Sequence, residues 1–348
     1  MTLITSRKLR TGLRLLRNVT STRLGRPRPV VALWETTYRC NMGCAFCNEK
    51  NLVTPELDTD AALRMLAQLD ELGTSVLILT GGEPTLRKDF GTLTQAIERS
   101  GLGSILCTNG SNVERQLDAV RRIDFIRISV DGFGEAHDSI RAARGSFERI
   151  RRAVPALLAV GKRPMLVTVV TRHATLENLG LLLAQARLWG VQVDLSMVVY
   201  SLRTQLVSPA TQLVTDIQRQ SRLPTPEFLE LLDKLQREYP DVIANPNFYK
   251  QLIGSGGLGQ RCRALDVSLN IKPDGSVTLP CDAFTLRKLD GDLRTVWDQM
   301  QQLSEMKREL GTFGFCSNCY KRCIAFPSLL LEPSYLFDLV RSYFPTLA

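Results

Sequence analysis

The sequence predicts an α/β protein, with a partial (β/α)6 barrel followed by a small α+β unit. Between residues 30 and 200, short apolar segments alternate with segments of helical spacing. Apolar strands that alternate with helices indicate a parallel sheet with right-handed crossovers. After residue 240 the alternation stops, and clustered cysteines appear around a Pro273-Asp274-Gly275 hairpin signal.

The expected elements follow one another in regular order. Strands are expected at residues 30–37, 75–80, 104–108, 125–130, 165–171 and 191–200, and helices at 60–72, 90–99, 146–159, 176–189 and 224–239. Residues 240–260 read as a loop region, and one further helix is expected near 295–309. In parallel sheets the chemistry lies at the carboxyl ends of the strands, and the motifs described below fall there.

The charge of the chain is concentrated at its N-terminus. The net charge is +9, and the first 34 residues contain no acid. The basic residues there are Arg7, Lys8, Arg10, Arg14, Arg17, Arg23, Arg26 and Arg28. The remainder is therefore nearly neutral, so a general nucleic-acid-binding surface is not indicated, and no nucleic-acid partner is expected.

Leu9, Leu13 and Leu16 recur at helical spacing among these basic residues. The pattern predicts a basic amphipathic helix, followed by an extended linker at residues 26–29. Three interpretations stay open: a membrane-surface anchor, a helix packed on the body with solvated arginines, and an organellar transit peptide. Neither a secretory signal nor a membrane span is expected, so the predicted location is the cytoplasm, with attachment to the inner membrane face if the helix is an anchor.

Cys40, Cys44 and Cys47 lie within eight residues, directly after the first expected strand. Thiolates are the ligands that iron–sulfur clusters and zinc select, and three ligands leave one iron of a four-iron cluster open. The run Cys40-Asn41-Met42-Gly43-Cys44-Ala45-Phe46-Cys47 resembles the signature of the radical S-adenosylmethionine (SAM) superfamily. The resemblance implies a TIM-type core, a [4Fe–4S] cluster on three catalytic cysteines, SAM on the open iron, and Phe46 against the adenine. A structural zinc knuckle is the alternative.

Further motifs extend this resemblance over most of residues 31–200. Gly81-Gly82-Glu83-Pro84 looks like the family's GGEP motif, whose backbone and glutamate contact the SAM amino group. Two strand-end turns and a downstream cation complete the implied SAM contacts: Thr108 and Asn109, Ser129 and Asp131, and Arg141 facing the SAM carboxylate. A helix-end charge on the surface is the alternative for Arg141. His137 is interpreted as a capping or packing residue.

A second cysteine group follows the core. Cys262, Cys281, Cys316, Cys319 and Cys323 resemble the C-terminal auxiliary domain called SPASM or, when shortened, twitch. The resemblance implies a second [4Fe–4S] cluster on the first four, with Cys323 as the alternative fourth ligand. A four-cysteine zinc ribbon remains possible on residue type. Cys107 matches neither group and is expected to be a small buried hydrophobic residue.

The implied activity is reductive cleavage of SAM to a 5′-deoxyadenosyl radical, which abstracts hydrogen from an unactivated carbon of a small-molecule, lipid or peptide substrate. The auxiliary cluster would assist oxidation or substrate positioning, and a flavodoxin- or ferredoxin-type protein would supply electrons. The N-terminal helix resembles the entry of lipid-modifying, hopanoid-type radical SAM enzymes, and apolar residues follow 335 at helical spacing, so a lipid or isoprenoid substrate is expected. The alternatives are a SPASM-type peptide maturase and a non-enzymatic zinc-binding protein.

We therefore expect four regions. Residues 1–29 form the basic helix and linker, 30–240 the radical SAM core, 241–328 the auxiliary cluster domain and 329–348 an apolar tail.

Overall fold

The computed structural model describes residues 6–44, 46–47, 49, 52–198, 219–220, 222–259, 262–279, 288–289, 291–313, 316, 319, 322–333 and 335. Its centre is a nine-stranded sheet with the order β6-β5-β4-β3-β2-β1-β7-β8-β9. Cys281 and the apolar tail after residue 335 lie outside the described residues, as does the side chain of Cys323.

Six parallel strands form the core of this sheet, and they lie side by side in chain order. They are β1 (Val31–Thr37), β2 (Val76–Gly81), β3 (Gly103–Thr108), β4 (Phe125–Ser129), β5 (Met165–Val170) and β6 (Gln192–Met197). Buried and half-buried residues alternate along β2 and β4, because one face packs under helices and the other lines the inside of the barrel. The expected fold class is confirmed.

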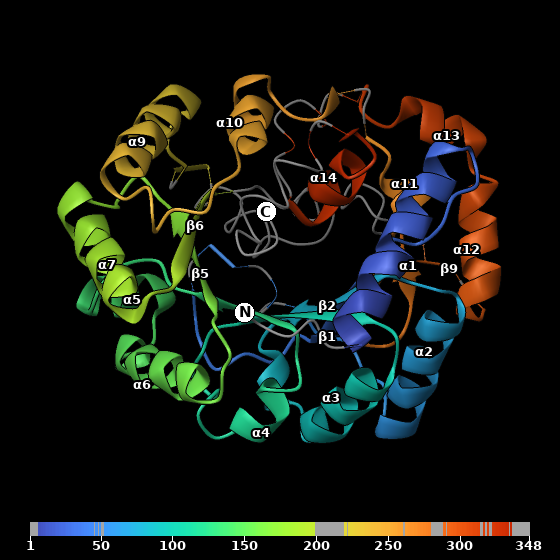
Figure 1. Ribbon diagram of the computed structural model, residues 1–348, viewed down its shortest axis with the longest axis horizontal. Helices are drawn as coiled ribbons and strands as arrows, with labels where there is room; N and C mark the ends of the chain where they lie inside the picture. The colour runs from blue at the N-terminus through green and yellow to red at the C-terminus, as the bar shows by residue number, and fades with distance from the viewer. Residues whose placement is uncertain are drawn as a thin grey trace.

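Helices cover the outer face of the sheet and form a ring around the strands (Figure 1). The expected helices are α2 (Thr59–Glu71), α3 (Phe90–Arg99), α6 (Ser146–Ala159), α7 (Leu176–Trp189) and α9 (Thr225–Glu238). Local signals fix their ends: the side chain of Asp58 accepts a hydrogen bond from the amide of Ala61 at the start of α2, and Gly190 ends α7 in a left-handed conformation. The short helices α4 (Leu117–Val120) and α5 (Glu135–Arg141) were not expected.

The C-terminal unit continues the core sheet. β7 (Ser268–Ile271) pairs in parallel with β1, and β8 (Val277–Thr278) pairs antiparallel with β7. β9 (Lys288–Leu289) then pairs with β8. The expected hairpin is therefore present, but tertiary pairing places it at the edge of the barrel sheet, which its own sequence pattern does not reveal.

Two expectations for this half of the chain were wrong. The expected loop region contains α10 (Asn247–Gly254), which buries Phe248 and Tyr249. The expected single helix near 295–309 is two helices, α12 (Leu293–Gln301) and α13 (Ser304–Glu309). α11 (Ala264–Val267) and α14 (Arg322–Leu329) complete the unit and contact each other.

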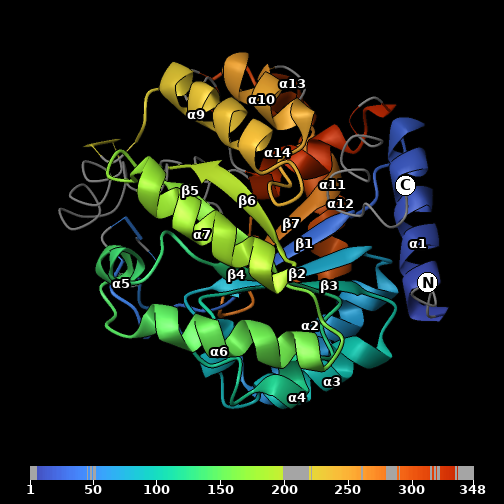
Figure 2. The same cartoon turned by 60° about the vertical axis from the view of Figure 1, so that its left-hand side comes forward.

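The N-terminal helix α1 (Ser6–Arg23) lies at the amino ends of the core strands, and α5 lies on the opposite side of the molecule (Figures 1 and 2). The amide of Asn18 donates to the carbonyls of Pro29 and Gly73, which precede β1 and β2. Val19 is buried in a small apolar cluster with residues of β1 and the segment after α14. The helix therefore packs on the body. Within the described residues, no helix is long and apolar enough to cross a bilayer.

Candidate active site

The first cysteine loop begins where β1 ends, at the carboxyl edge of the sheet. Cys44 is buried, and Cys40 and Cys47 are half-buried. The loop is held at its middle by the amide of Gly43, which donates to the carbonyl of Arg141 at 3.1 Å. No disulfide joins the described cysteines, so each of the three carries a thiol.

The turn after β2 packs against the chain that enters this loop. A Cβ on Gly81 would lie 2.3 Å from the carbonyl oxygen of Thr37, and one on Gly82 would lie 2.3 Å from that of Arg39. Gly81 also has a φ of +115°. The amide of Gly82 donates to Thr37 at 2.7 Å and that of Glu83 to Arg39 at 2.9 Å. Only glycine permits this approach, so the two glycines set the distance between the turn and the cysteine loop.

Glu83 is fully buried and joins the second strand turn to the third. Its carboxylate accepts from the amide of Thr85 at 3.1 Å, the hydroxyl of Thr108 at 2.8 Å and the amide of Asn109 at 2.7 Å. Burial raises the pKa of this carboxyl, and the hydrogen bonds from Thr85, Asn109 and Thr108 oppose that shift. Most of its hydrogen-bond acceptor positions are thus occupied by groups of the protein. The carboxylate therefore holds the turn after β2 against the turn after β3. Pro84, also buried, starts a short 3-10 helix behind it.

Asn109 connects the third strand turn to the cysteine loop. Its side-chain amide donates to the side-chain oxygen of Asn41 at 2.9 Å and lies 3.8 Å from the sulfur of Cys40. The side chain of Asn41 also donates to Ser111 at 2.9 Å. The turn motif and the cysteine loop are therefore in direct contact, as their shared position at the carboxyl edge predicts.

Arg141 ends α5 and points into the cysteine loop. Its Nε lies 2.6 Å from Oδ2 of Asp131 in an ion pair, and its guanidinium nitrogen lies 3.9 Å from the sulfur of Cys44. The guanidinium also stands over the ring of Phe46, 5.7 Å from its centroid. Burial lowers the pKa of Arg141, but the neighbouring Asp131 and Cys44 outweigh it, so the guanidinium stays charged. The alternative of an exposed helix-end charge was wrong.

Asp131 and His137 form a buried pair behind this arginine. The amide of Asp131 donates to Nδ1 of His137 at 3.0 Å, and its carboxylate accepts from the amide of Val169 at 2.8 Å. Burial and the charge of Arg141 lower the pKa of His137 to about 3. The histidine is therefore a neutral packing residue. Ser129 is half-buried at the end of β4.

The first loop offers three cysteine thiols, the ligand type that iron–sulfur clusters select. Among the described residues, no three Cys, His, Asp or Glu side chains converge closely enough to hold a single ion. A cubane cluster spreads its thiolate ligands over separate irons. Burial raises the pKa values of the Cys40 and Cys47 thiols, so binding a cluster would have to release their protons.

Two further buried groups were missed by the sequence analysis. Arg87, three residues after the GGEP motif, donates to the carbonyls of Thr36 and Leu57 at 3.0 and 2.9 Å. Nζ of Lys272 lies 2.8 Å from the carboxylate of Glu35, and both side chains are buried. The Lys272–Glu35 pair joins the ends of β7 and β1 beside the cysteine loop. An isolated Lys or Arg in a sequence carries no signal that it is buried.

The comparisons with known proteins agree with this geometry. Residues 34–182, which contain the cysteine loop and the three strand turns, match the family model of the radical SAM superfamily. Residues 34–182 form a radical SAM domain. The expected [4Fe–4S] cluster and SAM are the cofactors of this enzyme family.

Relatives of the radical SAM domain differ in how much of the chain they match. Fe-coproporphyrin III synthase of Methanosarcina barkeri is 30% identical over 36% of this chain, which is 33% of that protein. Mycofactocin maturase MftC of Mycolicibacterium smegmatis is 27% identical over 85% of this chain and 76% of its own. PqqA peptide cyclase of Rhizobium meliloti is 25% identical over 86% of this chain and 81% of its own. The similarity to the last two therefore continues through the C-terminal unit.

A solved structure has the same fold. SuiB of Streptococcus suis, bound to its precursor peptide SuiA, superposes with a TM-score of 0.64 and 18% identity. The superposition covers 84% of this chain and 70% of SuiB. The radical SAM core and the strands that follow it are thus arranged as in SuiB.

The second cysteine group draws on distant parts of the chain. Gly257 and Cys319 form a parallel backbone bridge, and the amide of Cys319 donates to the carbonyl of Cys316 at 3.1 Å. Cys262 precedes α11, and burial, with a smaller contribution from Cys316, raises the pKa of its thiol. A Cβ on Gly257 would lie 3.0 Å from the amide nitrogen of Cys319, so this glycine allows the two segments to meet. The structure therefore brings Cys316 and Cys319 against Gly257, in the segment that leads to Cys262.

Cys107 belongs to neither group. It is half-buried on β3, opposite Arg127 of β4 in the register. The expected burial is therefore only partial, although burial is still enough to raise the pKa of the thiol.

Proposed function

We propose that this protein is a radical SAM peptide maturase that carries an auxiliary iron–sulfur cluster in its C-terminal unit. One observation carries the proposal: the cysteine loop and the three strand turns form one connected network, in a chain whose similarity to a maturase and a peptide cyclase covers 85% and 86% of its length. The match to the porphyrin-related relative is confined to 36% of the chain.

In this proposal Cys40, Cys44 and Cys47 hold the first cluster. SAM lies against the Gly81–Pro84 turn, Phe46 and the strand ends that carry Thr108, Asn109, Ser129 and Asp131. Cys262, Cys281, Cys316 and Cys319 hold the second cluster, with Cys323 as the alternative fourth ligand. When bound, the first cluster and SAM supply one-electron chemistry that removes a hydrogen atom from an unactivated carbon.

The residues of this chain then act by positioning. Gly81 and Gly82 let the backbone come close to the cysteine loop, and Glu83 holds their turn against the third strand. Arg141 is held by Asp131 at 2.6 Å and fixes Cys44 and Phe46. A preorganised site of this kind limits the movement of its ligands. Arg141 is also the cation available to a SAM carboxylate.

A peptide substrate is favoured over the lipid or isoprenoid expected from the sequence. The lipid expectation depends on the two termini, and neither the family match nor the relatives that cover most of the chain support it. PqqA peptide cyclase is named for a peptide, and SuiB was solved with a precursor peptide. A flavodoxin- or ferredoxin-type protein is the proposed electron donor.

The test compares strains that differ only in this chain. One strain carries the wild type, one carries Cys40→Ala/Cys44→Ala/Cys47→Ala, and a matched control carries Cys107→Ala. Mass spectrometry of peptide and lipid extracts follows anaerobic growth. We expect a modified peptide with wild type and control that is missing with the triple variant. A lipid change without any peptide change would overturn the proposal.

A further inference from the structure

Three leucines of α1 are exposed to solvent, among basic residues. Leu9, Leu13 and Leu16 are 56%, 59% and 59% exposed, and Leu24, just after the helix, is 75% exposed. The helix packs on the body through a different face, which contains Leu15, Asn18, Val19 and Thr22. The sequence pattern therefore identified the helix correctly, but the leucines that define the pattern point away from the protein core.

This exposure is fixed by the packing of the helix. Asn18 is fully buried and donates to Pro29, Gly73 and Ser75 at 3.0, 2.8 and 2.9 Å. Arg14 forms an ion pair with Asp70 at 2.7 Å. The helix cannot rotate to bury the leucines without breaking these contacts. A row of leucines that the fold holds in water indicates a binding surface.

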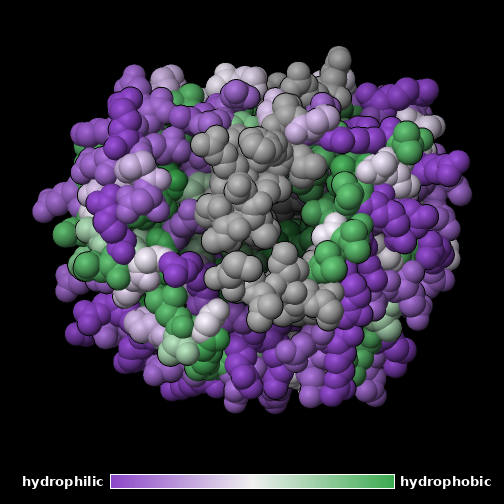
Figure 3. All heavy atoms as spheres, in the orientation of Figure 1, coloured by the Kyte–Doolittle hydropathy of each residue, from purple (hydrophilic) through white to green (hydrophobic). Residues whose placement is uncertain are grey.

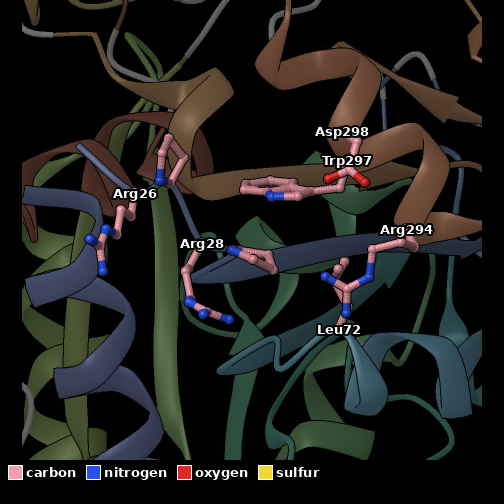
Figure 4. Close-up of a pocket in the computed structure, with 8 residues that line it drawn as sticks. Arg26, Arg28, Leu72, Arg294, Trp297 and Asp298 are labelled. Carbon is pink, nitrogen blue, oxygen red and sulfur yellow. The ribbon is translucent and has the colours of Figure 1, made fainter. Parts of the chain in front are cut away.

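Basic residues lie next to the leucines in the sequence of α1, and others line a cleft beside the linker that follows the helix. Arg10 and Arg17 flank them on the helix, and the linker after it enters a cleft of about 230 Å³. Arg28 of the linker and Arg294 of α12 line this cleft together with Trp297 (Figure 4). Among the described residues, no carboxylate lies within ion-pair distance of the following five: Arg10, Arg17, Arg26, Arg28 and Arg294. Asp298 is the acidic residue in the cleft lining.

We propose that α1 and the arginine cleft bind the surface of an anionic phospholipid bilayer. Leucines on a basic helix enter the boundary between headgroups and acyl chains, while arginines pair with lipid phosphates. A nucleic acid would use the arginines but would leave the leucines in water. In Figure 3, hydrophobic and strongly hydrophilic surface lie side by side where Figure 1 draws α1.

The proposal also fixes an orientation. α1 covers the amino ends of the strands, and the cysteine loop lies at their carboxyl ends. A bilayer bound at α1 would therefore lie behind the barrel, with the active site facing away from the membrane. Membrane attachment and a water-soluble peptide substrate are compatible in this arrangement.

Vesicle binding tests the proposal with full-length protein. The vesicles contain phosphatidylcholine alone, or phosphatidylcholine and phosphatidylglycerol in equal parts. Leu9→Ser/Leu13→Ser/Leu16→Ser should weaken binding to the anionic vesicles about 100-fold. The matched control, Leu176→Ser/Leu181→Ser/Leu188→Ser, removes three exposed leucines of α7 and should bind like the wild type.

A second pair of variants tests the charges. Arg26→Gln/Arg28→Gln/Arg294→Gln should weaken binding about 100-fold at low salt. Arg121→Gln/Arg151→Gln/Arg152→Gln removes the same charge from exposed sites elsewhere and should change binding less than about threefold, because exposed charges act only over a Debye length. Equal binding to neutral vesicles, or equal losses in variant and control, would overturn the proposal.

Insertion is tested by fluorescence. A tryptophan introduced by Leu13→Trp should be quenched by lipids that carry bromine on their acyl chains, and one introduced by Leu188→Trp should not. Quenching of both or of neither would contradict the proposed orientation.

Discussion

The two cysteine groups are built in different ways. The first lies on one loop, within eight residues of sequence, and strand ends already aligned by the sheet surround it. The second takes Cys262 from before α11, and Cys316 and Cys319 from after α13, so the fold must bring them together. The first group is thus defined by a short stretch of sequence at the end of the parallel sheet, and the second group depends on contacts between distant segments.

The largest expected effect separates the roles of the two groups. We expect the reconstituted protein to hold about eight irons as two [4Fe–4S] clusters. The variant Cys40→Ala/Cys44→Ala/Cys47→Ala should hold about four irons and form no 5′-deoxyadenosine. Cys262→Ala/Cys281→Ala should still cleave SAM but lose the final product. Iron analysis measures the cluster content, and chromatography measures 5′-deoxyadenosine and the final product. The control Cys107→Ala should match the wild type in each. SAM cleavage by the triple variant would refute the assignment of the first loop.

A smaller effect concerns the ion pair between Lys272 and Glu35, which joins the C-terminal unit to the first strand of the core. Lys272→Met leaves the carboxylate of Glu35 buried without the lysine that lies 2.8 Å from it, so the free energy of unfolding should fall by about 3–5 kcal/mol. Glu35→Gln/Lys272→Met removes both charges and should recover much of that loss. Denaturant unfolding under anaerobic conditions measures it. If Lys272→Met is as stable as wild type, the Lys272–Glu35 pair does not hold the C-terminal unit to the core.

The smallest effect concerns His137, which lies on α5 near the first cysteine loop. Its pKa of about 3 in the folded protein lies below the value of about 6.5 for an exposed histidine. The unfolded chain therefore binds a proton first as the pH falls, and the folded state loses about 1 kcal/mol per pH unit below pH 6.5. His137→Asn keeps an acceptor for the amide of Asp131 but cannot titrate. Between pH 6.5 and 5, wild type should lose more stability than this variant; parallel pH profiles would argue against a buried neutral histidine.

The sequence was informative wherever a signal is local. Alternating apolar segments predicted six strands, because a strand buried on both faces needs a continuous apolar run. The glycine pair at Gly81 and Gly82 could be recognised because only glycine permits the close backbone approach that this turn needs. The sequence also placed the third strand turn and the first cysteine loop at the same edge, since parallel strand ends meet at one edge of a sheet, but it did not predict that Asn109 lies 3.8 Å from Cys40.

The remaining features depend on contacts between distant segments. The ion pair between Arg141 and Asp131 at 2.6 Å could not be predicted from the sequence, which named both residues only as implied SAM contacts. Leu13 points outward because a different face of α1 bonds to Asp70 and Gly73. Helical spacing predicts that the leucines share one face of the helix, but not whether that face meets the protein or the solvent. The hairpin signal likewise does not predict that β7 pairs with β1.

What the sequence alone determined is therefore the class of the core, the order of its strands and the position of the first cysteine loop, because each follows from short-range periodicity or from residues close together in the chain. Only the tertiary structure decided that the C-terminal hairpin extends the barrel sheet, that Lys272 reaches Glu35 across 237 residues, and that the leucines of α1 face water. These features depend on which surfaces meet when the whole chain folds, and a pairing energy between distant residues leaves no periodic trace in the sequence.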